Sequence, residues 1–101
     1  MNTCFTAKFQ LGQIVATPNA LEALQRNGSD GRTLLRRHAA GDWGAVCKDD
    51  AALNDLAIQD GSRILSAYLL PDETTFWIIT DATIDDEGTR QVTTLLLPED
   101  Y

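Results

Sequence analysis

The sequence predicts an α+β domain in which three short helices pack on a small antiparallel sheet of three C-terminal strands, with a fourth strand near the N-terminus as a further candidate. The chain has 101 residues, a length that suits one domain spanning 1–101. Apolar residues recur at helical spacing between residues 18 and 59, whereas residues 63–97 follow the twofold alternation of strands. With 44% hydrophobic and 23% charged residues, the chain has the composition of a folded protein.

The first elements expected are a strand and a helix. The segment Gln13–Ala16 is apolar and reads as a short strand. Thr17 then precedes a proline, which is the typical order of an N-cap and a first helical position. We therefore expect a helix over Pro18–Arg26, with Leu21 and Leu24 on one face.

Two more helices follow, each ended by a glycine. Ser29 or Asp30 is expected to cap the first of them, over residues 31–40. The next is expected over residues 50–59, opened by Asp49 or Asp50. Its apolar spacing predicts that the inward side chains are Leu53, Leu56 and Ala57.

The C-terminal half reads as three strands, over residues 63–70, 74–80 and 90–97. Their short connections make neighbours antiparallel. In the middle strand Phe76 and Ile78 face one way, and Trp77 and Ile79 the other. Both faces of the sheet are therefore apolar. One face must pack the helices, and the other needs cover from the N-terminal strand, from a partner, or from a second subunit in a homodimer.

Charge is divided unevenly along the chain. The net charge is −7, with +2 on residues 1–47 and −9 on residues 48–101. The acidic half disfavours direct binding to nucleic acid phosphates. It suits either a basic protein surface or a solvated face that keeps the protein soluble. The three arginines at 32, 36 and 37 form a basic patch too small to indicate a nucleic-acid site.

The N-terminal residues and the cysteines indicate a cytoplasmic protein. Residues 1–8 lack the basic and apolar regions of a signal peptide, and no apolar stretch reaches membrane-spanning length. Cys4 and Cys47 have no metal-ligand spacing, so two reduced and largely packed thiols are expected, with a disulfide as the alternative.

Chemistry-bearing residues are few, and no cofactor or metal is expected. His38 is the one histidine; a packing or capping role on its helix is favoured over general-base catalysis. The acidic run Asp85-Asp86-Glu87 lacks the spacing of a calcium loop. Asp81, at a strand end, is expected to turn the chain. Trp43, between glycines, either plugs the core, the favoured reading, or anchors a partner.

Six segments of the chain carry a resemblance: Leu11–Pro18, Arg37-His38, Gly41–Gly44, Gly61–Tyr68, Trp77–Thr80 and Thr93–Tyr101. Together they resemble a family of small uncharacterised bacterial proteins found on plasmids and integrative elements. Some members of that family are labelled plasmid-related, or as the M subunit of a type I restriction system. The resemblance implies a mobile-element setting and no established chemistry, and the stretch 82–89 looks inserted relative to the family. This chain has no glycine fingerprint or Asn-Pro-Pro-Tyr motif for a methyltransferase.

Two functional hypotheses follow. The favoured one is a non-enzymatic protein that binds a basic surface of a host or defence-system protein. The alternative is a small enzyme such as a nuclease-like toxin, with Arg63, Tyr68 and His38 as candidates on fold analogy alone. For the favoured hypothesis the charged rim would be Asp72, Glu73, Asp85, Asp86 and Glu87, and the anchor would be Trp43 or Trp77.

Overall fold

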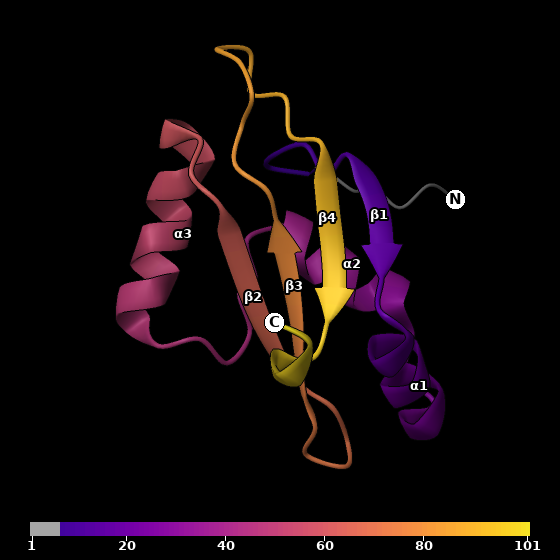
Figure 1. Cartoon of the computed structure of the whole chain (residues 1–101). Helices are drawn as coiled ribbons and strands as arrows, with labels where there is room; N and C mark the ends of the chain where they lie inside the picture. The colour runs from indigo at the N-terminus through magenta and orange to yellow at the C-terminus, as the bar shows by residue number, and fades with distance from the viewer. Residues whose placement is uncertain (1–6) are drawn as a thin grey trace, which may run out of the picture.

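The computed structural model describes residues 7–101, which form three α-helices, four β-strands and a final turn of 3-10 helix (Figure 1). The predicted α+β class is confirmed. Each predicted element is present, with ends that differ by at most two residues. In chain order they are β1 (Gln13–Ala16), α1 (Pro18–Asn27), α2 (Gly31–Ala39), α3 (Lys48–Asp60), β2 (Ile64–Leu69), β3 (Thr75–Thr80), β4 (Val92–Leu96) and η1 (Pro98–Asp100).

The four strands form one mixed sheet in the order β1-β4-β3-β2. The three C-terminal strands pair antiparallel with one another, as predicted, and β1 lies parallel to β4. The N-terminal strand therefore widens the sheet and does not cover its second face. A parallel pair needs a long connection between its two strands. Between β1 and β4 this connection consists of the three helices and the β2–β3 hairpin.

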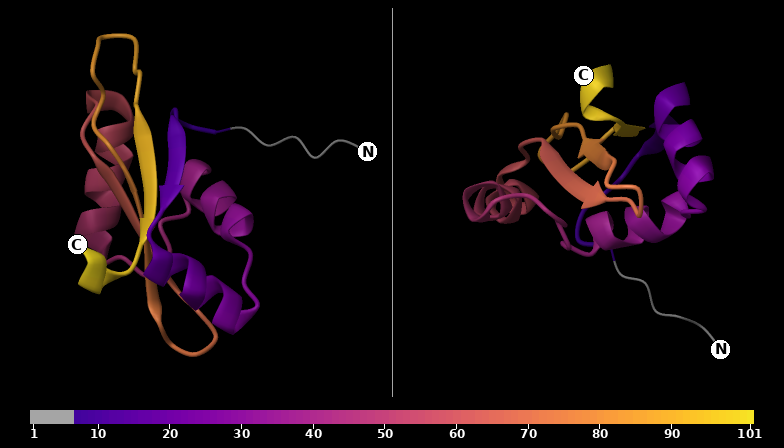
Figure 2. Two further views of the ribbon diagram at one scale, coloured as in Figure 1. Left: turned by 45° about the vertical axis from the view of Figure 1, so that its right-hand side comes forward. Right: turned by 90° about the horizontal axis from the view of Figure 1, so that it is seen from below.

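Helices α1 and α2 cover one face of the sheet (Figure 2). This is the face that carries Phe76 and Ile78, both fully buried. Of the predicted pair on α1, Leu24 is buried, whereas Leu21 is exposed because the helix turns Ala20 and Ala23 toward the sheet instead. The main core consists of Ala20, Ala23, Leu24, Leu34, Tyr68, Leu70, Phe76, Ile78, Leu95 and Leu97.

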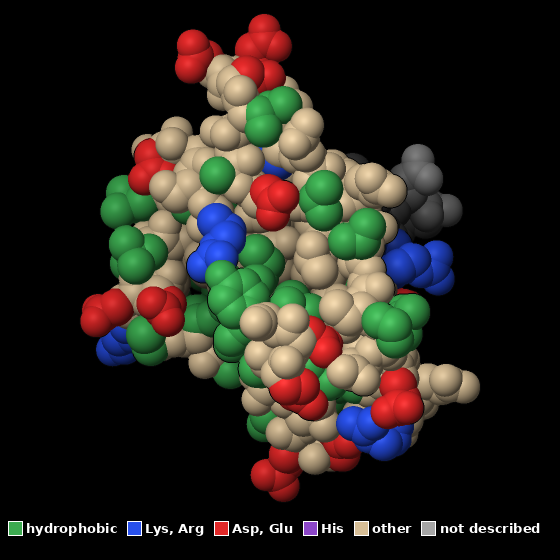
Figure 3. Space-filling model, in the orientation of Figure 1, with side chains coloured by type: hydrophobic (Ala, Val, Ile, Leu, Met, Phe, Trp, Pro, Cys, Tyr) green, Lys and Arg blue, Asp and Glu red, His purple; other side chains and the backbone are tan. Residues whose placement is uncertain are grey.

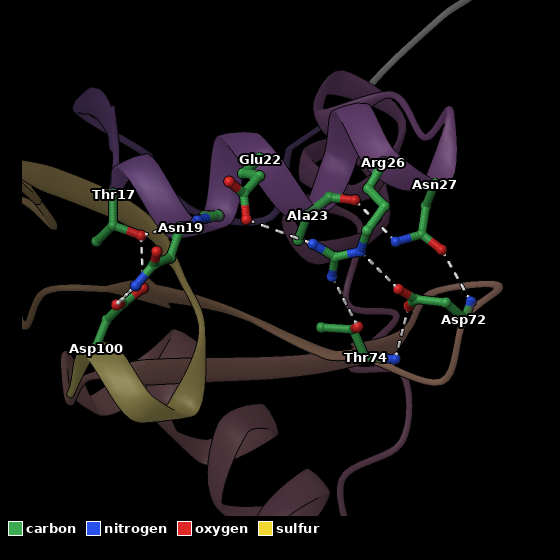
Figure 4. Close-up of polar contacts among 10 residues, drawn as sticks. Thr17, Asn19, Glu22, Ala23, Arg26, Asn27, Asp72, Thr74 and Asp100 are labelled. Atoms are coloured by element: carbon green, nitrogen blue, oxygen red, sulfur yellow. Dashed lines mark hydrogen bonds and ion pairs between the residues drawn. The ribbon is translucent and has the colours of Figure 1, made fainter.

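Helix α1 is fastened at both ends to distant parts of the chain (Figure 4). The hydroxyl of Thr17 accepts from the backbone N–H of residue 20, which is the predicted N-cap, and donates to Asp100 at 2.6 Å. Asn19 also donates to Asp100, at 2.7 Å. At the other end Arg26 pairs with Asp72 at 2.9 Å. The C-terminus and the β2–β3 turn thus hold α1 on the sheet.

Helix α3 packs beside β2, at the edge of the sheet, and the predicted inward leucines are wrong. Leu53 and Leu56 are 62% and 59% exposed, whereas Asn54 and Ala57 are buried. The Asn54 amide donates to the carbonyl of Leu65 at 2.7 Å and accepts from its N–H at 3.2 Å. The edge strand offers unpaired backbone groups, so the helix turns its polar residue inward to pair with them.

The segment 43–45 covers the next part of the same edge. The N–H of Ala67 donates to the carbonyl of Trp43 at 3.1 Å, and the N–H of Ala45 donates to the carbonyl of Ala67 at 2.6 Å. Gly44 lies between them with φ +74°, where a Cβ would fall 2.0 Å from the Ala67 carbonyl oxygen. Only glycine fits such a close approach in the left-handed region.

Arg90 joins three segments in the interior. It is 2% exposed, and its guanidinium donates to the carbonyls of Ala57, Ser62 and Asp81 at 2.7–3.0 Å. The carbonyl of Ala57 belongs to the last turn of α3, where the helix dipole favours a cation. This side chain therefore fixes the C-terminal end of α3 against the sheet.

Cys47 precedes α3 and is exposed, so the prediction of a packed thiol is wrong for this residue. Its side chain makes no capping hydrogen bond, and Asp49 and Asp50 lie in the first turn rather than at the cap. Negative charge is favourable there because of the helix dipole. Cys4 lies outside the described residues. None of the helices within residues 7–101 has the length and apolar character needed to cross a bilayer.

Candidate protein-interaction surface

One face of the sheet is not covered by α1 or α2, and we call it the open face. Strand alternation points the side chains of Trp77 and Ile79 to this side, opposite to Phe76 and Ile78. In Figure 1 the η1 turn and the C-terminal end of the chain lie in front of the sheet, on this side. The open face comprises Val15, Leu65, Ala67, Trp77, Ile79, Thr94 and Leu96.

An aromatic and cationic cluster lies on the open face. The Trp77 and Tyr101 rings meet edge to face with centroids 5.9 Å apart. The guanidinium of Arg63 stacks over the Tyr101 ring, 5.6 Å from its centroid, and donates to the Tyr101 hydroxyl. Figure 3 shows apolar side chains gathered around the centre of this face, beside a basic one. The cluster shields Ile79 and Leu96, which are buried, but leaves Trp77 partly accessible.

A groove of about 270 Å³ runs between this cluster and α3. Asp50 and Leu53 line it from α3, and Arg63 and Leu65 line it from the sheet. The exposed Leu56 lies one turn from Leu53 on the same helix. A groove with an exposed leucine on one wall and both charge signs at its rim fits an amphipathic segment better than a small molecule.

The acid that lines this groove is Asp50, in the first turn of α3. Helix α3 carries Asp49, Asp50, Asp55 and Asp60 against one base, Lys48, so its net charge is −3. The sequence pattern does not predict this wall, because its apolar spacing places Leu53 and Leu56 inward and it assigns Asp49 or Asp50 to the start of the helix. The leucines alternate with acids in the sequence, and this was the one indication that they could be exposed. Whether they are exposed depends on which side of α3 packs against the sheet.

The predicted acidic rim is split by the structure. Asp72 and Glu73 lie in the β2–β3 turn, and the run Asp85-Asp86-Glu87 lies in the β3–β4 loop, at the opposite end of the sheet (Figure 1). The two groups cannot border one contact surface of ordinary size, because consecutive connections of a strand meander alternate between the two ends.

Two of the predicted rim acids have roles within the fold. Asp72 accepts from the backbone N–H of Thr74 and from Arg26, and these hydrogen bonds hold the pKa of its carboxyl far below the usual range. Asp85 accepts from the N–H groups of Thr89 and Glu87, which lowers its pKa as well. These carboxylates stabilise their own turns. Glu73, Asp86 and Glu87 are exposed.

The two predicted anchors have different environments. Trp43 is 6% exposed, packs with Ala57 and Ile64, and donates from Nε1 to Asp55 at 3.0 Å. It fills the space between α3 and the sheet, as a core side chain does, and presents no surface for a partner. Trp77 lies on the open face and is the tryptophan that a partner can reach.

His38 is buried at the centre of a hydroxyl network. Oγ1 of Thr93 donates to the carbonyl of Leu11 at 2.6 Å, so it must accept from Thr80, at 2.7 Å. Thr80 therefore accepts from Nε2 of His38 at 2.8 Å, and Nδ1 accepts from Ser66 at 2.5 Å. Burial, with the nearby charge of Arg90, lowers the pKa of His38 to about 4. Both ring nitrogens are occupied, and the role of this histidine is structural.

The residues of the enzyme alternative do not converge. Tyr68 lies under the helices, where its hydroxyl donates to the carbonyl of Asp42 at 2.7 Å and burial raises its pKa to about 12. His38 is on the same side, whereas Arg63 is on the open face. Within residues 7–101 no group of three or more acidic, histidine or cysteine side chains could hold a metal ion.

Comparison of the chain with known protein families, curated proteins and solved structures found no match. The geometry of the described residues therefore carries the functional argument alone. The family resemblance noted from the sequence stays a prediction.

Proposed function

We propose that this protein is a non-enzymatic binding module that holds a basic, amphipathic segment of a partner protein in the groove between α3 and the open face. The observation that supports the proposal most directly is the orientation of α3. Its buried side consists of Asn54 and small or half-buried residues, whereas its two leucines point into solvent beside the groove. Exposed leucines on a helix that could have buried them indicate a contact surface.

The chemistry of the partner follows from the two walls of the groove. Leu53, Leu56 and the accessible part of Trp77 favour apolar anchors on the partner. The acids of α3 favour lysines or arginines around those anchors, and the net charge of −7 would speed their approach at low salt. The mobile-element setting and a partner from a host defence system remain predictions from the resemblance.

The test is a comparison of two leucine variants in a capture experiment. A tagged protein carrying Leu53→Ser and Leu56→Ser is compared with the unchanged protein and with a Leu21→Ser control. Leu21 is exposed to a similar degree on α1, which is remote from the groove. We expect partners recovered by the unchanged protein to bind the double variant about tenfold or more weakly, and the control equally well.

Charge variants then locate the electrostatic contribution. Reversing Asp49 and Asp50 to lysine is expected to weaken capture, and reversing Asp86 and Glu87 in the distant β3–β4 loop is expected to change it little. Equal capture by all the leucine variants, each shown to be folded by circular dichroism, would refute the groove as the binding surface. If capture were lost only in the variant with Asp86 and Glu87 reversed, the binding site would lie at the β3–β4 end of the sheet.

A further inference from the structure

The outer edge of β1 is the least protected part of the sheet. Among residues 7–101 no segment pairs with it, since β1 is the last strand of the order and its one neighbour is β4. Figure 2 shows α2 on the helix-covered face and not in the plane of the sheet beside β1. Ile14 and Val15 point to opposite faces, yet they are 43% and 38% exposed, as expected of a strand open from the side.

The backbone of β1 offers hydrogen bonds on that side. The N–H groups of Gln13 and Thr17 donate to β4 and its flank, to the carbonyls of Gln91 and Leu95 at 2.8 and 3.0 Å. In a parallel ladder alternate residues face the partner strand. The N–H and C=O groups of Ile14 and Ala16 therefore point away from β4, and no strand within residues 7–101 pairs with them.

The charge pattern identifies what kind of strand would fit. Residues 9–21 contain no charged side chain, and no proline or lysine interrupts β1 itself. Natural edges are usually protected by such residues. In a protein of net charge −7, this uncharged stretch is where a second copy meets the least repulsion. A basic peptide, by contrast, would find no carboxylate along β1 to select it.

The two ends of β1 also carry opposite charge. At the N-terminal end a small groove is lined by Leu11, Arg32 and Arg36. At the C-terminal end Asp100 is hydrogen-bonded to Thr17. An antiparallel neighbour places the N-terminal end of one strand beside the C-terminal end of the other. The basic end of each copy would then lie near the acidic end of its partner, which a parallel arrangement would not achieve.

We propose that two copies of this chain pair through β1, antiparallel and around a twofold axis at Val15, so that two four-stranded sheets become one continuous sheet. In this register Ile14 of one copy faces Ala16 of the other, and the two such pairs exchange about four hydrogen bonds. On the open face the row Leu65, Ile79, Thr94 and Val15 of one copy continues into the same row of its partner.

The experiment is sedimentation velocity over a dilution series of the full chain. Pairing of two four-residue strands is expected to bury less than the roughly 1,000 Å² that a stable interface needs, so a concentration-dependent dimer is expected. Val15→Lys, which puts a charge at the twofold axis, should weaken the dimer about tenfold or more. The control Leu53→Lys changes an exposed leucine of α3, beside the opposite edge of the sheet, and should leave the dimer unchanged.

Two further measurements keep the proposal testable if Val15→Lys disturbs folding. The pair Arg32→Glu and Arg36→Glu, which leaves the strand intact, should also weaken the dimer. Amide exchange on the unchanged protein should show protection of Ile14 and Ala16 that rises with concentration, while that of Val15 stays constant.

Three results would overturn the proposal. The first is a monomer at every concentration. The second is a dimer that is lost with Leu53→Lys and retained with Val15→Lys, which would place the interface at the groove. The third is protection of Ile14 and Ala16 in a monomer, which would mean that the edge is occupied within the same chain. None of these outcomes decides the proposed function, because partner capture is measured at the groove.

Discussion

The two edges of the sheet differ in how their outward backbone groups are satisfied. At β2 the groups of Leu65 pair with the side chain of Asn54, and those of Ala67 pair with the segment 43–45. At β1 no described segment pairs with Ile14 or Ala16. The contrast teaches that a sheet edge can be closed without a further strand, by one amide side chain and three residues of loop.

Closing the β2 edge has a consequence for the surface. Because α3 turns Asn54 inward, its leucines face outward: Leu53 lines the groove, and Leu56 lies one turn further along the helix. The closed edge therefore creates a side-chain surface, and the uncovered edge offers backbone hydrogen bonds. Each edge is suited to a different kind of partner, a protein segment at β2 and a second strand at β1.

The largest expected effect is at Gly44, on the closed edge. A Cβ there would meet the Ala67 carbonyl at 2.0 Å, at a φ of +74°. Gly44→Ala should lower the free energy of unfolding by about 3–4 kcal/mol, combining left-handed strain with overpacking. The measurement is urea unfolding. Gly28→Ala is the matched control, since φ is +60° and nothing lies within 4 Å; it should cost about 1 kcal/mol. Equal losses would show that Gly44 does not seal the edge.

The second effect is at Asn54. Asn54→Ala removes both hydrogen bonds to Leu65 and should lower the free energy of unfolding by about 2–3 kcal/mol, because part-buried backbone groups lose their partners. Gln59→Ala, on the exposed side of the same helix, should change stability by less than about 0.5 kcal/mol. A loss at Asn54 no greater than at Gln59 would mean that water closes this edge equally well.

The third effect concerns β2, β3 and β4, which the network of His38 joins through Ser66, Thr80 and Thr93. Its pKa is about 4 in the folded protein against 6.5 for an ordinary histidine. The unfolded chain therefore binds the proton first, and stability that is complete above pH 6.5 is lost as the pH falls toward 4. Between pH 7 and 5 the loss should be about 2 kcal/mol, before most carboxylates titrate.

Urea unfolding at several pH values measures the effect at His38. The chain has one histidine, so a His38→Gln variant should show almost no slope in this window, although it will be less stable throughout. An unchanged slope in that variant would assign the pH dependence to another group.

The smallest effect is expected at the uncovered edge. Val15→Lys at low protein concentration should change the free energy of unfolding by less than about 0.5 kcal/mol, because the long side chain can reach solvent from an edge position. The same dilution of the unchanged protein gives the reference. A decrease in the free energy of unfolding close to that expected for Asn54→Ala would show that the β1 edge is covered in the monomer.

Much of the fold could be predicted from local patterns, because caps, glycines and alternation act over a few residues. Thr17 capped α1 as expected, and the side chains of β3 alternated between the faces as expected. What failed were the features that depend on distant partners. Leu53 and Leu56 have correct helical spacing for a buried stripe, but α3 packs on an edge that requires hydrogen bonds. The acidic loops could not be separated before the strand order was known.

The pairing of β1 with β4 also has a consequence for how the chain acquires its shape. Gln13 faces Val92, a partner 79 residues further along the sequence. During synthesis the first strand is complete long before its neighbour exists, and contacts this far apart in sequence form slowly. For that interval β1 is an apolar segment with both edges free, which exposes the nascent chain to aggregation. Arrival of the last strand is therefore the step that ends this exposure.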